Sequence, residues 1–191
     1  MLKLLWKECD RMPNMSGHMA VAKKVSKILD INSEDFYRGN LLPDLYIDKK
    51  KSHYKIKGKK YMIPDIDYVV NVLDLKDEKN LGYLTHLLLD KYYLEEYLMD
   101  IDCDVFEGNQ LYKDYDILNK DIVEYFKLDT KYLTSILSKI DDDFSNDKLK
   151  LILECLLKNE DGKTTYLDKE KFINFLDEVS LKIAKEIEIY I

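Results

Sequence analysis

The segment from Gly82 to Tyr97, GYLTHLLLDKYYLEEY, contains a histidine and an aspartate four residues apart. On a helix, His86 and Asp90 would share one face, with Cβ atoms about 5–6 Å apart. The residues between them are all leucine, so the pair is predicted to be buried, and a buried carboxylate needs a partner or a metal ion. The spacing therefore allows a metal site. It equally allows an ordinary core, in which His86 donates to a backbone carbonyl and Asp90 pairs with a lysine such as Lys91.

Three more residues of metal-binding type precede this pair: His18, Asp44 and His53. His18 falls at the start of a predicted helix, where the helix dipole disfavours a cation, so its imidazole is expected to be neutral and able to bind a metal. With His86 and Asp90 the set comprises three imidazoles and two carboxylates, the ligand types that zinc takes; iron and manganese also suit such a site. Two ions roughly 3.5–4 Å apart that share a carboxylate are the usual arrangement for hydrolysing phosphate esters.

Four motifs that carry these residues occur in an order that resembles the zinc-dependent phospholipase C family, which is related to the single-strand-specific zinc nucleases. The resemblance spans residues 16 to about 98, less than half of the chain. The motifs are Ser16-Gly17-His18, Gly39-Asn40-Leu41-Leu42-Pro43-Asp44, Lys51-Ser52-His53-Tyr54, and Gly82-Tyr83-Leu84-Thr85-His86 with Asp90.

The resemblance implies an all-helical fold and hydrolysis of a phosphodiester by metal-bound hydroxide, with a small phosphoester or a phospholipid-like molecule as substrate. It implies that Asp44, His53, His86 and Asp90 hold one zinc ion. His18 would help to hold a second ion, with Asp90 as the bridge. Asp44 would also act in catalysis by orienting the attacking water.

The chain departs from the family pattern after the helix with the His86–Asp90 pair. Secreted family members carry further histidines and a glutamate there, whereas this chain has only Glu95 and Glu96 in a comparable region. They also place an N-terminal tryptophan on a metal, while Trp6 is internal here. A third metal ion is therefore not expected, and the substrate could be a phosphoester other than a phospholipid.

The composition is that of a globular protein, and the formal charge of −7 argues against a stable nucleic-acid partner. The three cysteines, Cys9, Cys103 and Cys155, are far apart, which suits free thiols in a reducing compartment. No apolar run approaches the ~20 residues of a transmembrane span, and no secretory signal is recognisable. We therefore expect a cytoplasmic protein.

The chain has few glycines and prolines, and its apolar residues recur at helical spacing, which predicts a single all-α domain over residues 1–191. The resemblance implies that this domain is a multi-helix bundle of the phospholipase C and zinc nuclease type. Residues 16–98 would form the metal-site region and 99–191 a helical C-terminal part. Ser16 is the expected N-cap of the first helix. Residues 36–44 are expected to be extended or looped, because Pro43 disfavours a helical Leu42. The lysine-rich segment 48–60 is expected to be a solvated loop or a positive rim beside a phosphate-bearing substrate. Helices are predicted at about 17–29, 64–76, 82–97, 116–127, 130–140, 147–158 and 168–190.

Two other functions remain open on the sequence. Histidine–aspartate phosphohydrolases, which act on nucleotides, also use helical His and Asp sites, but they have an adjacent His-Asp dipeptide that this chain lacks. Alternatively, the protein is a non-catalytic helical protein with a vestigial or structural metal site. In that case the acidic part over about 100–191 would be an interaction surface, although the apolar stripe from Phe172 to Ile187 is predicted to pack in the core.

Overall fold

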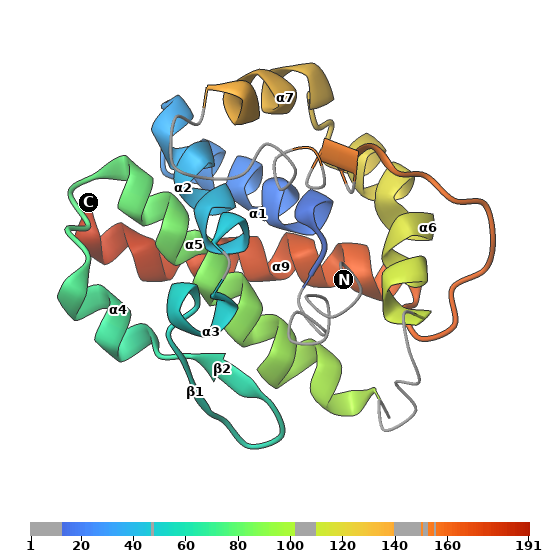
Figure 1. Cartoon of the computed structure of the whole chain (residues 1–191), viewed down its shortest axis with the longest axis horizontal. Coiled ribbons are helices and arrows are strands. Elements are labelled where there is room, and N and C mark those ends of the chain that lie inside the picture. Colours follow the sequence, from blue (N-terminus) through green and yellow to red (C-terminus); the bar gives the residue numbers. More distant parts are fainter. Residues whose placement is uncertain (1–12, 47, 102–109, 140–149, 151–152, 155) are drawn as a thin grey trace.

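The computed structural model describes residues 13–46, 48–101, 110–139, 150, 153–154 and 156–191, and this part of the chain is mostly helical (Figure 1). Its buried apolar side chains form one core, to which helices from both halves of the chain contribute. The predicted all-α class is confirmed, because the only strands among the described residues are two three-residue strands of one hairpin. None of the described helices is long and apolar enough to cross a membrane.

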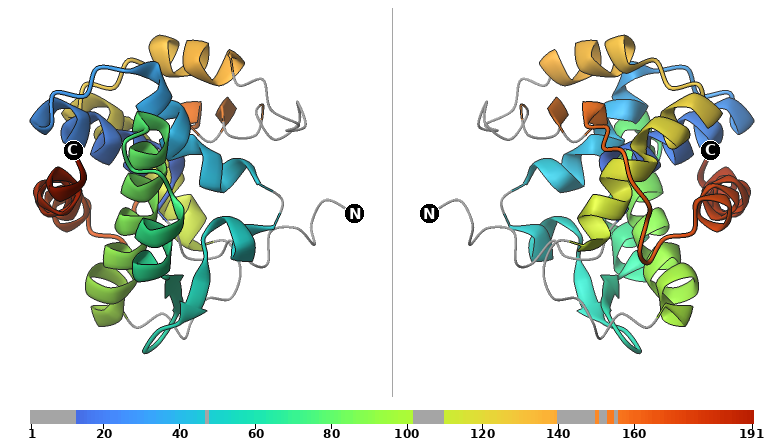
Figure 2. Two further views of the ribbon diagram at one scale, coloured as in Figure 1. Left: turned by 90° about the vertical axis from the view of Figure 1, so that its left-hand side faces the viewer. Right: turned by 90° about the vertical axis from the view of Figure 1, so that its right-hand side faces the viewer.

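Helix α9 (Lys169–Ile187) lies across α1 (Met15–Ile28) and α5 (Glu78–Tyr92) (Figures 1 and 2). The first half contains α1 (Met15–Ile28), α2 (Glu34–Leu45), α3 (Lys49–Ser52), β1 (Lys55–Lys57), β2 (Met62–Pro64), α4 (Ile66–Val72) and α5 (Glu78–Tyr92). Helix α5 continues as a π-helical turn, η2 (Tyr93–Tyr97), and a 3-10 turn, η3 (Leu98–Asp100). The second half contains α6 (Gln110–Tyr125), α7 (Thr130–Ser138), α9 (Lys169–Ile187) and η4 (Glu188–Tyr190).

Two glycines set the close packing of α2 against α5. A Cβ atom on Gly39 would lie 1.7 Å from the carbonyl oxygen of Lys79, and one on Gly82 would lie 1.9 Å from that of Phe36. Neither distance is sterically allowed, so only glycine lets the two backbones approach this closely. The side-chain amide of Asn40 then donates to the carbonyl of Gly82 at 3.3 Å. This contact fixes the position of the C-terminal half of α2, which carries Asp44.

The prediction that residues 36–44 are extended or looped is wrong, because this stretch forms most of α2. Ser33 caps the helix by accepting from the backbone N–H groups of Asp35 and Phe36. Pro43 lies in the last turn, where it removes one hydrogen bond and the helix ends two residues later. Burial of one face of α2 against α5 outweighs the local preference of Leu42 for an extended conformation.

The predicted N-cap of α1 is also wrong by two residues. Asn14 is the cap, and its side chain accepts from the backbone N–H of Gly17 at 3.1 Å. Ser16 lies inside the helix, where its hydroxyl donates to the side-chain oxygen of Asn119 in α6. The amide of Asn14 donates to the same oxygen at 2.7 Å. These bonds fix the start of α1, and with it His18.

The segment 48–60, expected to be a loop, contains helix α3 and the first strand of the hairpin β1–β2. The helix predicted over 64–76 is shorter, because Asp65 caps α4 only at Ile66 and the helix ends at Val72. The helix predicted over 82–97 begins earlier than expected, because α5 starts at Glu78. The helices predicted near 116–127, 130–140 and 168–190 correspond to α6, α7 and α9, and the apolar stripe of α9 is buried as expected. Half of the helix expected over 147–158 lies outside the described residues, and the described residues 150, 153–154 and 156–157 are helical.

Candidate metal centre

The five residues singled out in the sequence come together in the interior of the molecule. Four of them are fully buried or nearly so: His18 on α1, His53 at the C-terminal end of α3, and His86 and Asp90 on α5. Asp44, in the last turn of α2, keeps 19% of its side chain exposed. Two overlapping groups, His18 with His86 and Asp90, and Asp44 with His53 and His86, each have ligand atoms within 4.8 Å of one another.

The hydrogen-bond network assigns the tautomers of His53 and His86. Nδ1 of His86 lies 2.8 Å from the carbonyl oxygen of Asn40, and Nδ1 of His53 lies 3.0 Å from that of Lys49. A carbonyl oxygen only accepts, so Nδ1 of each ring carries the proton and Nε2 presents a lone pair. Metal-binding histidines are commonly fixed in this way by a carbonyl acceptor.

The distances among these groups suit a metal ion better than direct hydrogen bonds. Nε2 of His53 and Nε2 of His86 are 3.3 Å apart, and each lies 3.5 Å from Oδ2 of Asp90. Metal–ligand bonds of about 2.0–2.2 Å place tetrahedral ligand atoms about 3.3–3.6 Å apart. Asp44 is slightly farther, with its oxygens 3.7 Å from Nε2 of His53 and 4.0 Å from that of His86.

The carboxylate of Asp90 lacks the partners that a buried anion needs. Neither of its oxygens accepts a hydrogen bond, and no lysine forms an ion pair with it among the described residues, Lys91 included. Burial therefore raises the pKa of Asp90 well above its usual range, and the nearby Asp44 carboxylate adds to the rise. A cation between this carboxylate and the histidines would compensate the charge. The ordinary-core alternative is correct for His86, which donates to the backbone carbonyl of Asn40, but the lysine partner that it gave to Asp90 is not found among the described residues.

The three histidines are neutral at physiological pH and available as ligands. Burial lowers the pKa of His53 and of His86 to about 3, and it lowers the pKa of His18 well below the usual range. The ring of His18 stacks on that of His86, with centroids 3.7 Å apart and planes within 6°. Its Nε2 lies 3.4 Å from Oδ1 of Asp90, whereas Nε2 of His53 and of His86 face Oδ2. The two oxygens of Asp90 thus face different histidines.

Asp44 differs from Asp90 because it has a cationic neighbour. The ammonium of Lys49 donates to the Asp44 carboxylate and, at 2.7 Å, to its backbone carbonyl. Burial alone would raise the pKa of Asp44, but Lys49 and the histidines hold it well below its usual range. Asp44 is the most exposed of the five residues, so the cluster meets solvent beside α3.

The sequence did not predict the supporting roles of four residues around the cluster. Asn40 and Lys49 provide the carbonyl groups that fix the tautomers of His86 and His53, and these contacts join segments that no local pattern relates. The hydroxyl of Tyr83 donates to the carbonyl of Ser52 and holds α3 against α5. The hydroxyl of Ser52 donates to the carbonyl of Pro43 at 2.9 Å.

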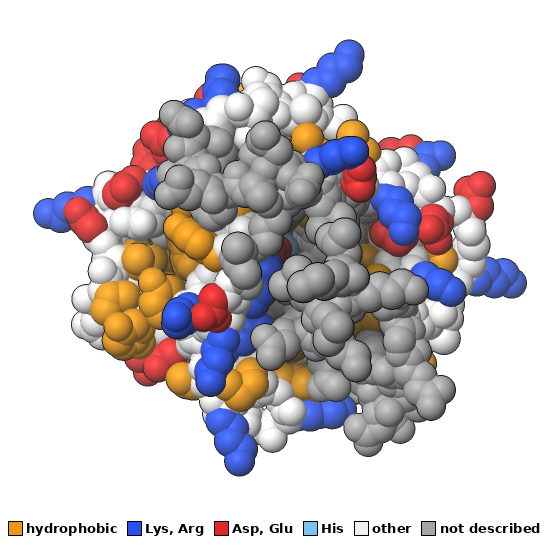
Figure 3. Space-filling view, in the orientation of Figure 1, with side chains coloured by type: hydrophobic (Ala, Val, Ile, Leu, Met, Phe, Trp, Pro, Cys, Tyr) orange, Lys and Arg blue, Asp and Glu red, His pale blue; other side chains and the backbone are white. Residues whose placement is uncertain are grey.

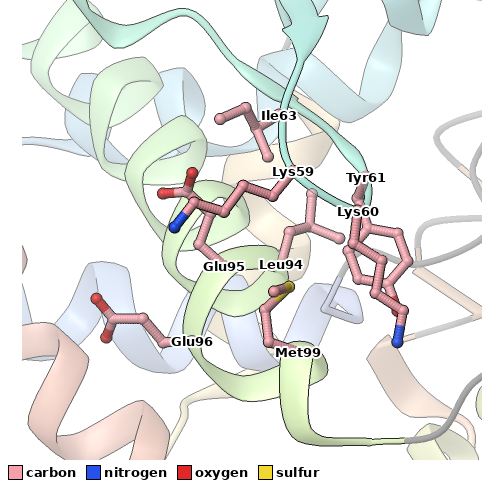
Figure 4. Close-up of a pocket in the computed structure, with 8 residues that line it drawn as sticks. All are labelled: Lys59, Lys60, Tyr61, Ile63, Leu94, Glu95, Glu96 and Met99. Atoms are coloured by element: carbon pink, nitrogen blue, oxygen red, sulfur yellow. The ribbon is translucent and has the colours of Figure 1, made fainter.

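Glu95 and Glu96, the acids that follow the His86–Asp90 pair, lie outside the cluster. They line a separate pocket of about 250 Å³ that begins one turn beyond Asp90, between the hairpin and η2 (Figure 4). Glu96 points away from Lys59 in this view and pairs with Lys182 of α9. None of the five clustered residues lines this pocket. Its full lining is Lys59, Lys60, Tyr61, Ile63, Leu94, Glu95, Glu96 and Met99.

Comparison of the chain with protein-family models, with curated proteins and with solved structures finds no match. The resemblance to zinc-dependent phospholipases C therefore rests on the four sequence motifs. The arrangement of the five side chains is an independent observation, and it identifies a buried His/Asp cluster able to hold a metal ion.

Proposed function

We propose that this protein is a metal-dependent phosphoester hydrolase with two ions, most simply zinc, in the His/Asp cluster. The observation that carries the proposal is the position of Asp90. Its carboxylate lies between Nε2 of His18 on one side and the unprotonated Nε2 atoms of His53 and His86 on the other, and it accepts no hydrogen bond. Such a carboxylate suits a bridge between two ions, and shared carboxylates of this kind are typical of centres that hydrolyse phosphate esters.

The distances support a division of the ligands into two sets. Asp44, His53, His86 and Oδ2 of Asp90 would hold the first ion, since they supply two nitrogens and two oxygens around one point. His18 and Oδ1 of Asp90 would contribute to the second. Mixed imidazole and carboxylate ligands suit zinc, iron and manganese.

The residues around the cluster have separate tasks in this proposal. Bound divalent ions would lower the pKa of water and polarise a phosphoryl oxygen. Asp44 is the ligand that solvent reaches, so its carboxylate is placed to accept a hydrogen bond from an attacking water. The side chain of Lys49, which is 14% exposed, lies beside the Asp44 carboxylate, and its ammonium would bind a phosphoryl oxygen of the substrate.

A structural metal site is the second candidate, and burial favours it. A first ion would have four protein ligands, three of them with 0 or 1% of their surface exposed. Structural zinc sites are closed in this way, whereas catalytic sites keep a position open for water. This candidate shares the metal with the proposed hydrolase but has no catalytic activity.

Metal analysis and a phosphodiesterase assay together test the proposal. We expect protein purified without chelators to contain about two equivalents of a divalent transition metal and to hydrolyse bis(p-nitrophenyl) phosphate. The His86→Ala variant is expected to lose both metal and activity. Glu95→Gln is the control, because Glu95 follows on the same helical segment outside the cluster, and it should retain both. Metal without activity on a broad panel of phosphoesters would favour the structural site, and absence of metal would refute both candidates.

A further inference from the structure

A second feature of the molecule, separate from the metal centre, is a concentration of positive charge on α3 and the β1–β2 hairpin. The segment 48–64 contains seven lysines and one acid, Asp48, although the whole chain has a formal charge of −7. Lys49 pairs with Asp44, and Lys51 is 3.4 Å from Asp48. We call the other exposed part of this segment, together with its exposed apolar side chains, the lysine hairpin surface. Its members are Lys50, Ile56, Lys57, Lys59, Lys60 and Met62.

The hairpin projects beyond the helices at the lower edge of the molecule (Figure 1). Its strands pair antiparallel, with Lys57 opposite Met62, and the backbone N–H of Gly58 closes the turn by donating to the carbonyl of Tyr61 at 2.9 Å. Lys59 and Lys60 therefore occupy the tip. The ammonium of Lys60 reaches the carbonyl of Ile101 at 3.4 Å, which connects the tip to the segment after η3.

Aliphatic side chains lie among these lysines. Ile56 and Met62 are 44% and 43% exposed, although both belong to strands. Met62 shares one face of the hairpin with Lys57, because directly opposed residues of an antiparallel pair point the same way. The space-filling view shows lysine side chains extending from this lower part of the molecule, with apolar side chains beside them (Figure 3).

We propose that the lysine hairpin surface binds the surface of an anionic lipid membrane. Lysines attract acidic headgroups, and exposed aliphatic side chains enter the boundary between headgroups and acyl chains; together these two terms set interfacial affinity. A nucleic acid would use the lysines as well, but single strands also require aromatic side chains for stacking. The exposed apolar members of the hairpin are instead isoleucine and methionine. The membrane proposal does not depend on the metal centre.

Co-sedimentation with lipid vesicles tests this inference on the full chain. We expect binding to vesicles of phosphatidylcholine with about 30% phosphatidylserine, little binding to pure phosphatidylcholine, and weaker binding at high salt. The double variant Lys57→Ala/Lys59→Ala should bind about 25-fold more weakly, at about fivefold for each lysine. The matched control is Lys113→Ala/Lys163→Ala, which removes the same charge from exposed positions outside the hairpin and should bind like the unchanged protein.

A second variant tests the apolar contribution. Ile56→Ser/Met62→Ser keeps every lysine, so we expect weaker binding that retains its dependence on salt. Absence of binding to the acidic vesicles, or an equal loss in the Lys113/Lys163 control, would overturn the proposal. Tighter binding to a single-stranded oligonucleotide than to vesicles would also overturn it and assign the surface to nucleic acid. Metal content should stay unchanged in all these variants, so the result is independent of the proposed hydrolase.

Discussion

Nε2 of His53 and Nε2 of His86 face each other across 3.3 Å, and neither nitrogen carries a proton. Two lone pairs at this distance repel, and the Asp90 carboxylate 3.5 Å from both adds negative charge to the same point. The rest of the fold maintains this unfavourable arrangement through carbonyl groups and buried packing. A cation at that point would convert the repulsion into coordination, so the metal-free and metal-bound proteins should differ sharply in stability.

Replacing Asp90 should affect metal binding and metal-free stability in opposite directions. Because the buried carboxylate has no partner and its pKa is raised, we expect Asp90→Asn to raise the free energy of unfolding of the metal-free protein at pH 8. The same variant should no longer bind zinc stoichiometrically. Urea unfolding with and without a chelator measures the first effect, and metal analysis the second.

Asp114 offers the matched control for this experiment. It is equally buried, but its carboxylate accepts from the backbone N–H groups of Thr165, Tyr166 and Leu167. Asp114→Asn should therefore lower the free energy of unfolding by about 2 kcal/mol and leave the metal content unchanged. If Asp90→Asn behaved in the same way, Asp90 would be an ordinary structural carboxylate.

The stability of the metal-free protein should fall on acidification. Burial lowers the pKa of His53 and His86 to about 3, so between pH 6.5 and 3 the unfolded chain binds protons that the folded chain excludes. His18 acts in the same direction. The raised pKa of Asp90 acts in the opposite direction but does not offset three histidines. We expect a loss of about 1–3 kcal/mol per pH unit between pH 6 and 4, measured by urea unfolding. A His86→Gln variant should show a shallower slope, and a flat profile in the unchanged protein would contradict the buried neutral histidines.

The approach of α2 to α5 should tolerate no side chain at Gly39. A Cβ atom there meets the Lys79 carbonyl at 1.7 Å, so we expect Gly39→Ala to lower the free energy of unfolding by about 3 kcal/mol or more. It should also weaken zinc binding, because Asp44 and the Asn40 carbonyl move with α2. Thermal unfolding and zinc titration measure the two effects. Gly17→Ala in α1 is the control, since its Cβ would lie 3.3 Å from the side chain of Asn14; a similar loss there would refute the argument.

Lys49 should compete with metal for Asp44. Its ammonium contacts the carboxylate that would hold the first ion, so Lys49→Met should tighten zinc binding by about tenfold, through loss of charge repulsion of about 1–2 kcal/mol. In the proposed hydrolase the same variant should raise KM for an anionic phosphodiester. Zinc titration against a competing chelator and steady-state kinetics provide the readouts. Lys50→Met, on the exposed side of α3, should change neither, and unchanged zinc affinity in Lys49→Met would contradict the competition.

The sequence predicted the helical class and the shared face of His86 and Asp90, because both follow from periodicity along the chain. It also predicted the buried stripe of α9, which depends on the same period. The prediction from sequence was wrong for α2. Pro43 locally disfavours a helix, but packing against α5 stabilises one over this segment. The residue types of a metal centre could therefore be predicted from the sequence, whereas the helix that carries Asp44 could not.

Only the tertiary structure decided how these side chains are held. The tautomer of His86 depends on the carbonyl of Asn40, 46 positions earlier in the chain, and the His53–His86 contact joins residues 33 positions apart. The close approach of α2 and α5 depends on where Gly39 and Gly82 meet other backbones. Periodicity reports which face of a helix is buried, but not which group it meets there. That pairing is determined by packing between distant segments.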